Sequence, residues 1–363
     1  SADPSSTALS SAAAAGSALV NVGMALAMTA GAKDPGALKS NLLWLNAVNM
    51  YCQSFGAVSI VKVNAPWFHV RERGVLGGLF GILISLGLYF SYDWSLGISQ
   101  KWGLSAAFWV PGGVLGFFAV VTAFMVRDSP SSAGFKDFDT GDATSGQVGR
   151  MPLKDVLRRM FSQHVIWIIV AIEFCSGFLR QAVMKQYRLF AKSVGEDHSF
   201  VYENWGMLLC VAGILGGVFA GFISDHVFNS RRGPVSSVLY GGLLAGAIAA
   251  FFLIGTPGLG WAIILISLCV IGVHGMLSGT ASMDFGGTKN AGVVTGIIDG
   301  FVYLGSGAQA FLFGRVLPTG VASKDPVEWT IWPGAMIPVA LIGLLLCASI
   351  WNARPQKSAA PAH

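Results

Sequence analysis

The stretch PVSSVLYGGLLAGAIAAFFLIG, residues 234–255, contains no charged side chain. About 20 mostly apolar residues are enough for an α-helix to cross the hydrocarbon core of a bilayer. The stretch therefore predicts a membrane-spanning helix, and nine similar segments lie on either side of it. The ten predicted spans are roughly 8–31, 41–64, 75–94, 104–126, 164–186, 203–224, 234–255, 259–283, 292–316 and 331–352.

The composition is typical of a chain that lies mostly in lipid. Hydrophobic residues make up 53% of the 363 residues and charged residues only 11%, whereas soluble domains contain roughly 25% charged residues. The chain also has 47 glycines, and small residues let transmembrane helices approach each other closely. We therefore predict an all-α, polytopic protein of the cell (inner) membrane.

The basic residues divide unevenly between alternate connections. One set of connections contains Arg71, Arg73, Arg127, Lys136, Arg150, Lys154, Arg158, Arg159, Arg231, Arg232, Lys289, Arg354 and Lys357. The opposite set contains only Lys33, Lys39, Lys101, Lys192 and Lys324, with Arg188 and Arg315 near span ends. Because loops rich in Lys and Arg stay in the cytoplasm, we predict a cytoplasmic central linker and a cytoplasmic C-terminus.

An internal repeat relates the two sides of this long polar linker. Gly74-Val75 opens the third span and Gly292-Val293 opens the ninth, and the same offset pairs Gly87 with Gly305. Six spans separate the copies, so we expect a repeat unit of six helices. The second half contains six spans and the first only four, so two spans are expected before Ser1.

The predicted organisation therefore has four parts. They are a truncated four-span bundle over 1–126, a cytoplasmic linker over 127–162, a six-helix bundle over 163–353 and a cytoplasmic tail over 354–363. Two six-helix halves joined by a cytoplasmic linker are typical of the major facilitator architecture, in which substrate binds between the halves near the bilayer midplane.

Three charged residues, Glu173, Arg180 and Lys185, lie in the fifth predicted span. A charge inside a span is costly unless it is paired or faces a cavity. Glu173 and Arg180 are two helical turns apart, so they share a face. We expect Arg180 to bind phosphate or carboxylate, because a guanidinium offers paired donors. Glu173 either balances a cation or belongs to a charge network that holds the fold, and Lys185 is expected in charge pairing or at the membrane interface.

Polar residues in two other spans leave two interpretations open. Lys62, near the end of the second span, either extends to the membrane interface or contacts the transport path. Asp299, in the ninth span near Tyr303, either pairs with a cation of another helix or couples transport to protons or ions.

Enzyme motifs are absent from the sequence. It has no GxSxG, HExxH or GxxxxGK[ST] pattern, and its five cysteines lie in apolar runs without CxxC spacing. The basic clusters are explained by topology, so we expect no nucleic-acid partner. We predict a monomeric transporter rather than an enzyme, with no cofactor and no metal.

Several segments resemble the organophosphate:phosphate antiporter family of the major facilitator superfamily, which includes bacterial glycerol-3-phosphate and hexose-6-phosphate transporters. The matching segments are WFHVRERG (67–74), RDSP (127–130), GFLRQ (177–181), GFISDHVFNSRRG (221–233), and GGTKNAGVVTG with YLG (286–305). The resemblance implies exchange of a phosphorylated metabolite, such as a sugar phosphate or glycerol phosphate, for inorganic phosphate by alternating access.

The resemblance also implies roles for individual residues. In the family, one arginine from each half holds the phosphate group, and Arg180 matches the arginine of the second half. Its partner belongs to the family's first helix, which is expected upstream of Ser1. Lys62 matches a basic position in the fourth helix of the family, and Tyr303 matches a tyrosine in the eleventh.

Three positions depart from glycerol-3-phosphate transporters. Ile84 stands where they carry a substrate-contacting histidine, Gly177 where they carry a tyrosine, and Lys185 where they carry an acidic residue. Another phosphorylated metabolite is therefore as consistent with the sequence as glycerol 3-phosphate. Two alternatives remain: a membrane sensor of sugar phosphate that acts with a histidine kinase, and a proton-coupled sugar transporter of the same fold.

Overall fold

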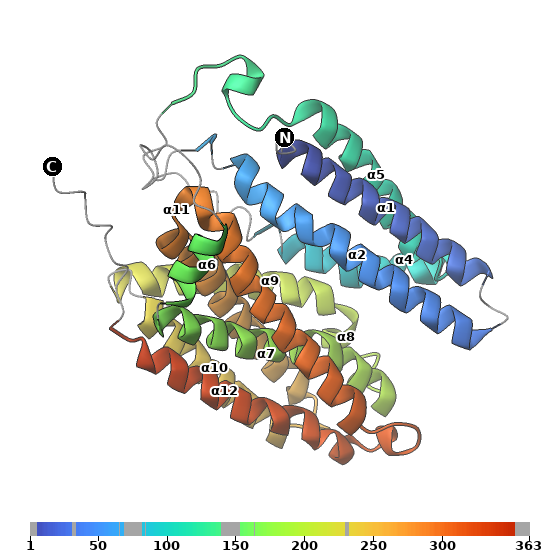
Figure 1. Ribbon diagram of the computed structural model, residues 1–363. Coiled ribbons are helices and arrows are strands. Elements are labelled where there is room, and N and C mark those ends of the chain that lie inside the picture. The colour runs from blue at the N-terminus through green and yellow to red at the C-terminus, as the bar shows by residue number, and fades with distance from the viewer. Residues whose placement is uncertain are drawn as a thin grey trace. The chain divides into compact units, whose positions relative to one another are not determined.

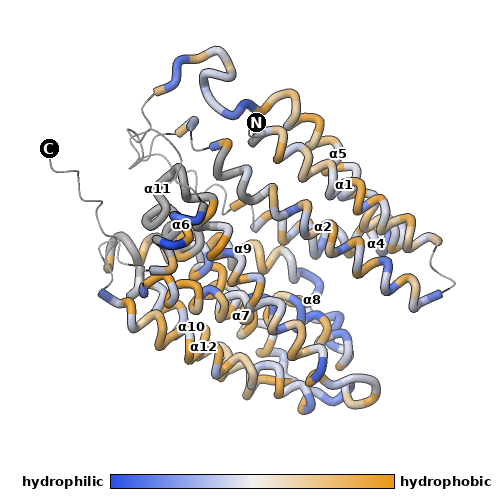
Figure 2. The backbone as a smooth tube through the Cα atoms, in the orientation of Figure 1, coloured by the Kyte–Doolittle hydropathy of each residue, from blue (hydrophilic) through white to orange (hydrophobic). Residues whose placement is uncertain are grey.

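The computed structural model describes residues 6–30, 34–64, 66–68, 82–83, 85–138, 153–162, 164–228 and 232–352. Every regular element in these ranges is helical (Figure 1), as predicted. Hydrophobic residues run along most of α5 and α12 (Figure 2). Seven described segments are long and apolar enough to cross a membrane: Thr7–Ala30, Ala106–Met125, His164–Val194, Gly233–Phe252, Gly258–Gly275, Gly296–Val316 and Pro326–Ser349.

These seven segments correspond to seven of the ten predicted spans. Of the other three, span 41–64 lies within a long helix that is less apolar, and span 203–224 contains the shorter apolar helix Trp205–Ala220. Span 75–94 is described only at residues 82–83 and 85–94. The chain is a multi-pass helical membrane protein.

The chain packs as two compact units, Ser1–Gly74 with Trp94–Ser145 and Val75–Asp93 with Gly146–His363. The first unit contains α1 (Ser6–Ala30), α2 (Pro35–Asn64), α4 (Ser95–Trp102), α5 (Ala106–Met125) and the short η3 (Ser131–Ala133). Helix α1 packs against both α2 and α5. The predicted division at residues 127–162 stays a prediction.

Small residues allow α1 to approach its two neighbours closely. A Cβ on Gly112 of α5 would lie 3.4 Å from the backbone oxygen of Ala18, and one on Gly16 would lie 2.8 Å from the Cys52 sulfur of α2. The Ser11 hydroxyl donates to the Ala119 carbonyl at 2.8 Å. The packing of this unit therefore depends on small side chains, as the glycine content indicates.

The second unit is built around α7 (His164–Val194), which packs against α11 (Gly258–Val316) and α12 (Ile331–Ser349). Its remaining elements are α6 (Leu153–Phe161), α8 (Phe200–Glu203), α9 (Trp205–His226), α10 (Arg232–Phe252), η4 (Ala322–Lys324) and η5 (Pro326–Thr330). The π-helical turn η2 (Phe90–Trp94) brings Asp93 to this unit, where the carboxylate accepts from the Gly206 and Met207 amides at 2.8 and 2.7 Å. Asp93 thereby caps the start of α9.

Backbone carbonyls of α7 accept hydrogen bonds from aromatic side chains of its neighbours. Tyr240 donates to Ile172 at 2.8 Å, and Trp332 donates to Ala182 at 3.1 Å. A buried aromatic donor needs such a partner. These bonds fix α10 and α12 to α7 within one hydrophobic core.

Helix α11 contains two predicted spans, 259–283 and 292–316, which were expected to be separate helices. His274 contacts Glu173 of α7, and Gly177 lies against Val302. His274 and Val302 would be about 42 Å apart in a straight helix, yet their partners on α7 are one turn apart. The backbone of α11 therefore folds back between Gly275 and Gly296, which gives two limbs (Figure 1).

The end of α7 and the structure of the linker also differ from the sequence prediction. Helix α7 continues to Val194, eight residues past the expected end, and stops where Gly195 adopts a φ of +82°. The Glu196 amide donates to the Ala191 carbonyl at 2.7 Å, as in a glycine-terminated helix end. The linker contains the helix α6, which the sequence analysis did not predict.

Candidate functional site

Glu173 and Arg180 of α7 lie next to a close crossing between α7 and the second limb of α11. Gly177 lies against the backbone of Val302, and Gly305 lies against the backbone of Phe174. The Ser306 hydroxyl donates to the Gly177 carbonyl at 3.1 Å. Because neither glycine has room for a side chain, the two backbones fix the positions of the residues one turn away.

This crossing explains one departure from glycerol-3-phosphate transporters. Gly177 stands where they carry a tyrosine, and here a Cβ at that position would collide with backbone atoms of Val302. A tyrosine would require the limb of α11 to move away from α7. The glycine is therefore part of the helix packing in this chain.

Arg180 lies one turn beyond Gly177 on α7 and is half-buried. Among the described residues, no carboxylate oxygen lies within 4.0 Å of its guanidinium. Its nearest acidic neighbour on the same helix, Glu173, interacts with it only at longer range. The paired donors of the guanidinium are thus not occupied by a described carboxylate, and they suit a phosphate or carboxylate ligand.

Glu173 lies one turn before Gly177 and is fully buried. Its Oε2 lies 3.3 Å from Nδ1 of His274, which comes from the first limb of α11. Its Oε1 has no hydrogen-bond partner among the described residues. The carboxylate that the sequence placed on the face of Arg180 therefore contacts a histidine.

The second limb of α11 brings two further predicted residues to this region. Asp299 is half-buried and within electrostatic range of Glu173. Tyr303, adjacent to the crossing residue Val302, is 59% exposed. Glu173, Arg180 and Asp299 thus form one electrostatic group, while the Tyr303 ring lies at the surface of the second unit.

Lys185 is not part of this group. Lys185 is exposed on α7, and three residues further on Arg188 stacks on the Tyr202 ring, with 4.6 Å between the guanidinium carbon and the ring centre. Lys62 lies in the last turn of α2, and its side chain lies outside the described residues.

The sequence analysis missed His274 as the partner of Glu173. The available signal was a titratable side chain inside an apolar span, the same signal that singled out Glu173. A single sequence gives no information on which helices pack together, so the pairing of α7 with the first limb of α11 could not be derived.

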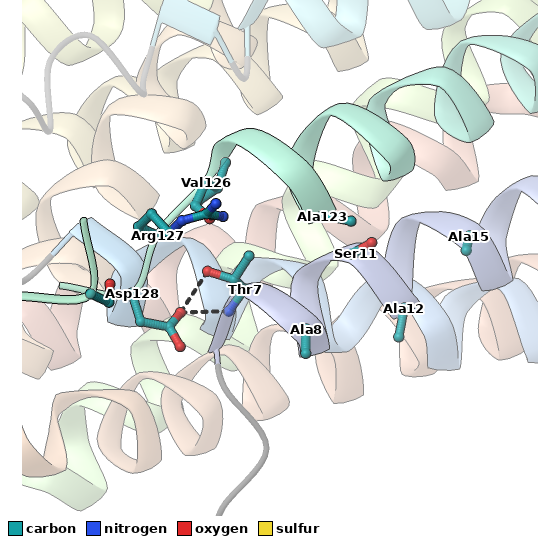
Figure 3. Close-up of a pocket in the computed structure, with 10 residues that line it drawn as sticks. Thr7, Ala8, Ser11, Ala12, Ala15, Ala123, Val126, Arg127 and Asp128 are labelled. Carbon is teal, nitrogen blue, oxygen red and sulfur yellow. Dashed lines mark hydrogen bonds between the residues drawn. The ribbon is translucent and has the colours of Figure 1, made fainter. Parts of the chain in front are cut away.

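A hollow in the first unit is lined in part by Arg127 and Asp128 of the RDSP segment, and its hydrogen bonds are those of a helix cap. Its lining residues are Thr7, Ala8, Ser11, Ala12, Ala15, Ala123, Val126, Arg127, Asp128 and Ser132 (Figure 3). The Asp128 carboxylate accepts from the Thr7 amide at 2.7 Å and from its hydroxyl at 2.6 Å. Trp67, from the WFHVRERG segment, donates to the Arg127 carbonyl at 3.0 Å. Trp67 and Asp128 therefore link the ends of α1, α2 and α5.

Comparison with known families matches residues 8–310 to the Major Facilitator Superfamily. The chain is 25% identical to the glycerol-3-phosphate transporter of Bacillus subtilis, over 84% of this chain and 69% of that protein. It is 24% identical to a probable hexose phosphate transport protein of Chlamydia trachomatis, over 89% of this chain and 73% of that protein. It is also 24% identical to the membrane sensor protein UhpC of Salmonella typhimurium, over 87% and 71%.

A solved structure has the same fold. The crystal structure of a variant of the E. coli fucose:proton symporter FucP aligns with a TM-score of 0.51 and 14% sequence identity, covering 93% of this chain and 83% of that chain. At this identity the likeness concerns the fold alone.

Proposed function

Because the chain belongs to the Major Facilitator Superfamily, we propose that it is a secondary transporter that exchanges a phosphorylated metabolite for inorganic phosphate by alternating access. The names of the relatives, a glycerol-3-phosphate transporter and a probable hexose phosphate transport protein, support a phosphate ester as substrate. A sugar phosphate or glycerol phosphate is the class of metabolite that we propose.

This proposal rests on the burial of Arg180 and on its lack of a described carboxylate partner. Its guanidinium lies half-buried in a span, and no described carboxylate is paired with it. A cation in this position is costly and needs a compensating partner. A phosphate group supplies that partner through two parallel hydrogen bonds. Inorganic phosphate and a phosphate ester share this group, so both compete for the same side chain.

Lys62 and Tyr303 are proposed to complete the substrate site. Lys62 adds positive potential, and Tyr303 contributes a hydroxyl that can donate to a phosphate or sugar oxygen. Bound phosphate drives the conformational switch only if its contacts differ between the two states, because a ligand shifts an equilibrium by its differential affinity.

The experiment that tests the proposal is exchange of labelled inorganic phosphate by the full chain in liposomes loaded with phosphate. We expect exchange that is inhibited by glycerol 3-phosphate or a hexose 6-phosphate. Arg180→Ala should lower the exchange rate about 100-fold. Arg180→Lys should have an exchange rate close to that of Arg180→Ala, because an ammonium lacks the planar arrangement of donors of a guanidinium.

The matched control is Lys192→Ala, which removes an exposed cation from the last turn of the same helix. This variant should exchange phosphate at the wild-type rate. Unchanged exchange in Arg180→Ala would reject the role of Arg180.

A second candidate function is sensing, which the relative named as a membrane sensor favours. A sensor would bind a sugar phosphate and signal to a histidine kinase without moving substrate. Retained phosphate binding, absent exchange and co-purification with a kinase would favour this function over transport.

We further propose that the protein is a monomer of the inner membrane, with the linker and C-terminus in the cytoplasm. The proposal rests on the excess of Lys and Arg in alternate connections. Cysteines introduced at exposed Lys136 and exposed Lys324 should react with an impermeant reagent on opposite sides of the membrane. Labelling of the Lys136 site from outside intact cells would contradict this topology, and a sedimentation mass of two chains would contradict the monomer.

A further inference from the structure

Two titratable side chains of the second unit, Glu173 and His274, lie in contact with each other. Glu173 is 0% exposed, and its Oε2 lies 3.3 Å from His274 Nδ1. The His274 side chain keeps 27% of its surface exposed. Glu173 is therefore enclosed by the protein, while His274, which contacts it, is partly exposed.

Groups on α7, α10, α11 and α12 interact electrostatically with Glu173. Asp299 of α11 and Arg180 of α7 itself interact electrostatically with Glu173. Tyr240 of α10 and Cys347 of α12 do so as well. A thiol or a phenol carries no charge at neutral pH. Arg180 and Asp299 are thus the charged groups that respond to the protonation state of the pair.

The pair has three protonation states with different net charges. One shared proton makes the pair neutral overall, loss of that proton leaves a buried negative charge, and gain of a second proton leaves a positive charge. The two groups titrate as a unit, because they are in direct contact. Since Glu173 Oε1 has no hydrogen-bond partner among the described residues, the state with an unneutralised carboxylate is costly.

We propose that Glu173 and His274 form a proton-binding site linked to phosphate binding at Arg180, a link that rests on the proposed function. Arg180 is two turns from Glu173 on α7, about 10 Å along the helix. A phosphate dianion at Arg180 adds negative charge near the pair and so favours uptake of a proton. Linkage between two binding sites is reciprocal, so a proton bound to the pair also raises the affinity for phosphate. The affinity for phosphate therefore falls as the pH rises and the pair loses its proton.

Calorimetric titration of the full chain with inorganic phosphate, in two buffers of different ionisation enthalpy, measures the protons taken up on binding. The variants are Glu173→Gln and His274→Gln. The matched control is His164→Gln, which removes an exposed histidine at the start of the same helix. Because phosphate itself titrates near neutral pH, the quantity compared is the difference between proteins, to which the ligand contributes equally.

The wild type and His164→Gln should take up as much as one proton more per phosphate than Glu173→Gln and His274→Gln. The same proton number in all four proteins would overturn the link. If inorganic phosphate does not bind, the proposed function fails, and a second measurement decides whether the proton site exists.

That second measurement is an NMR pH titration of the chain with labelled histidines and no phosphate. The His274 resonance is assigned by its loss in His274→Gln. Its titration curve should differ between the wild type and Glu173→Gln, because side chains in direct contact titrate as a unit. An identical midpoint in the wild type and Glu173→Gln would show that the two side chains do not titrate together.

Discussion

At the scale of single residues, Arg180 and Glu173 share α7 but have different surroundings. Glu173 is fully buried against His274, while Arg180 is half-buried and without a described carboxylate partner. A carboxylate locked onto Arg180 would have to be displaced before phosphate could bind, and the displaced acid would repel the incoming anion. Glu173 contacts His274 instead, so it is not the carboxylate that a phosphate group would have to displace from Arg180.

The glycine at position 305 is expected to be essential for this arrangement. Gly305→Ala should lower stability by about 2 kcal/mol, because the added Cβ meets the backbone of Phe174, which cannot move aside without separating the helices. Thermal unfolding of the purified protein in detergent measures the effect.

The control is Gly307→Ala on the same limb of α11, where an added Cβ meets no atom within 4 Å. This variant should be as stable as the wild type or slightly more stable, since alanine favours a helix over glycine. Equal loss of stability in both variants would show that the close crossing is not the cause.

At the scale of elements, the start of α1 depends on a residue far away in sequence. The first amides of a helix have no intrahelical acceptor, and Asp128 supplies one for Thr7 together with a bond to its hydroxyl. The carboxylate also suits the positive end of the helix dipole. The RDSP segment therefore joins the end of α5 to the start of α1.

Removing this cap should destabilise the first unit. Asp128→Ala is expected to cost about 1 kcal/mol, and amide hydrogen exchange should increase in the first turn of α1. Asp137→Ala is the control, because that carboxylate accepts from the Ser131 amide at the short η3 turn and not from α1 among the described residues. Unchanged exchange in α1 of Asp128→Ala would contradict the cap.

At the scale of the whole molecule, apolar runs are enough to predict most helices but not how they pack. Residues 234–255 predicted a span, and α10 covers nearly all of it. The positions of the two limbs of α11 followed in the same way. The helical turns between them did not, since the polar connection around Lys289 indicated a loop.

The candidate site could be predicted only in part for a related reason. Arg180 and Glu173 were assigned to one face because they belong to one helix, and helical periodicity determines that relation. The contact of Glu173 with His274 and the approach of Gly177 to Val302 depend on tertiary packing. No local pattern in the sequence specifies such contacts.

The central claim is that Arg180 binds a phosphate group, and equilibrium binding of inorganic phosphate to the purified full chain tests it most directly. Arg180→Ala should weaken binding about 100-fold, which corresponds to about 2.7 kcal/mol, while Lys192→Ala should bind as the wild type does. Equal phosphate affinity in the wild type and Arg180→Ala would contradict the claim.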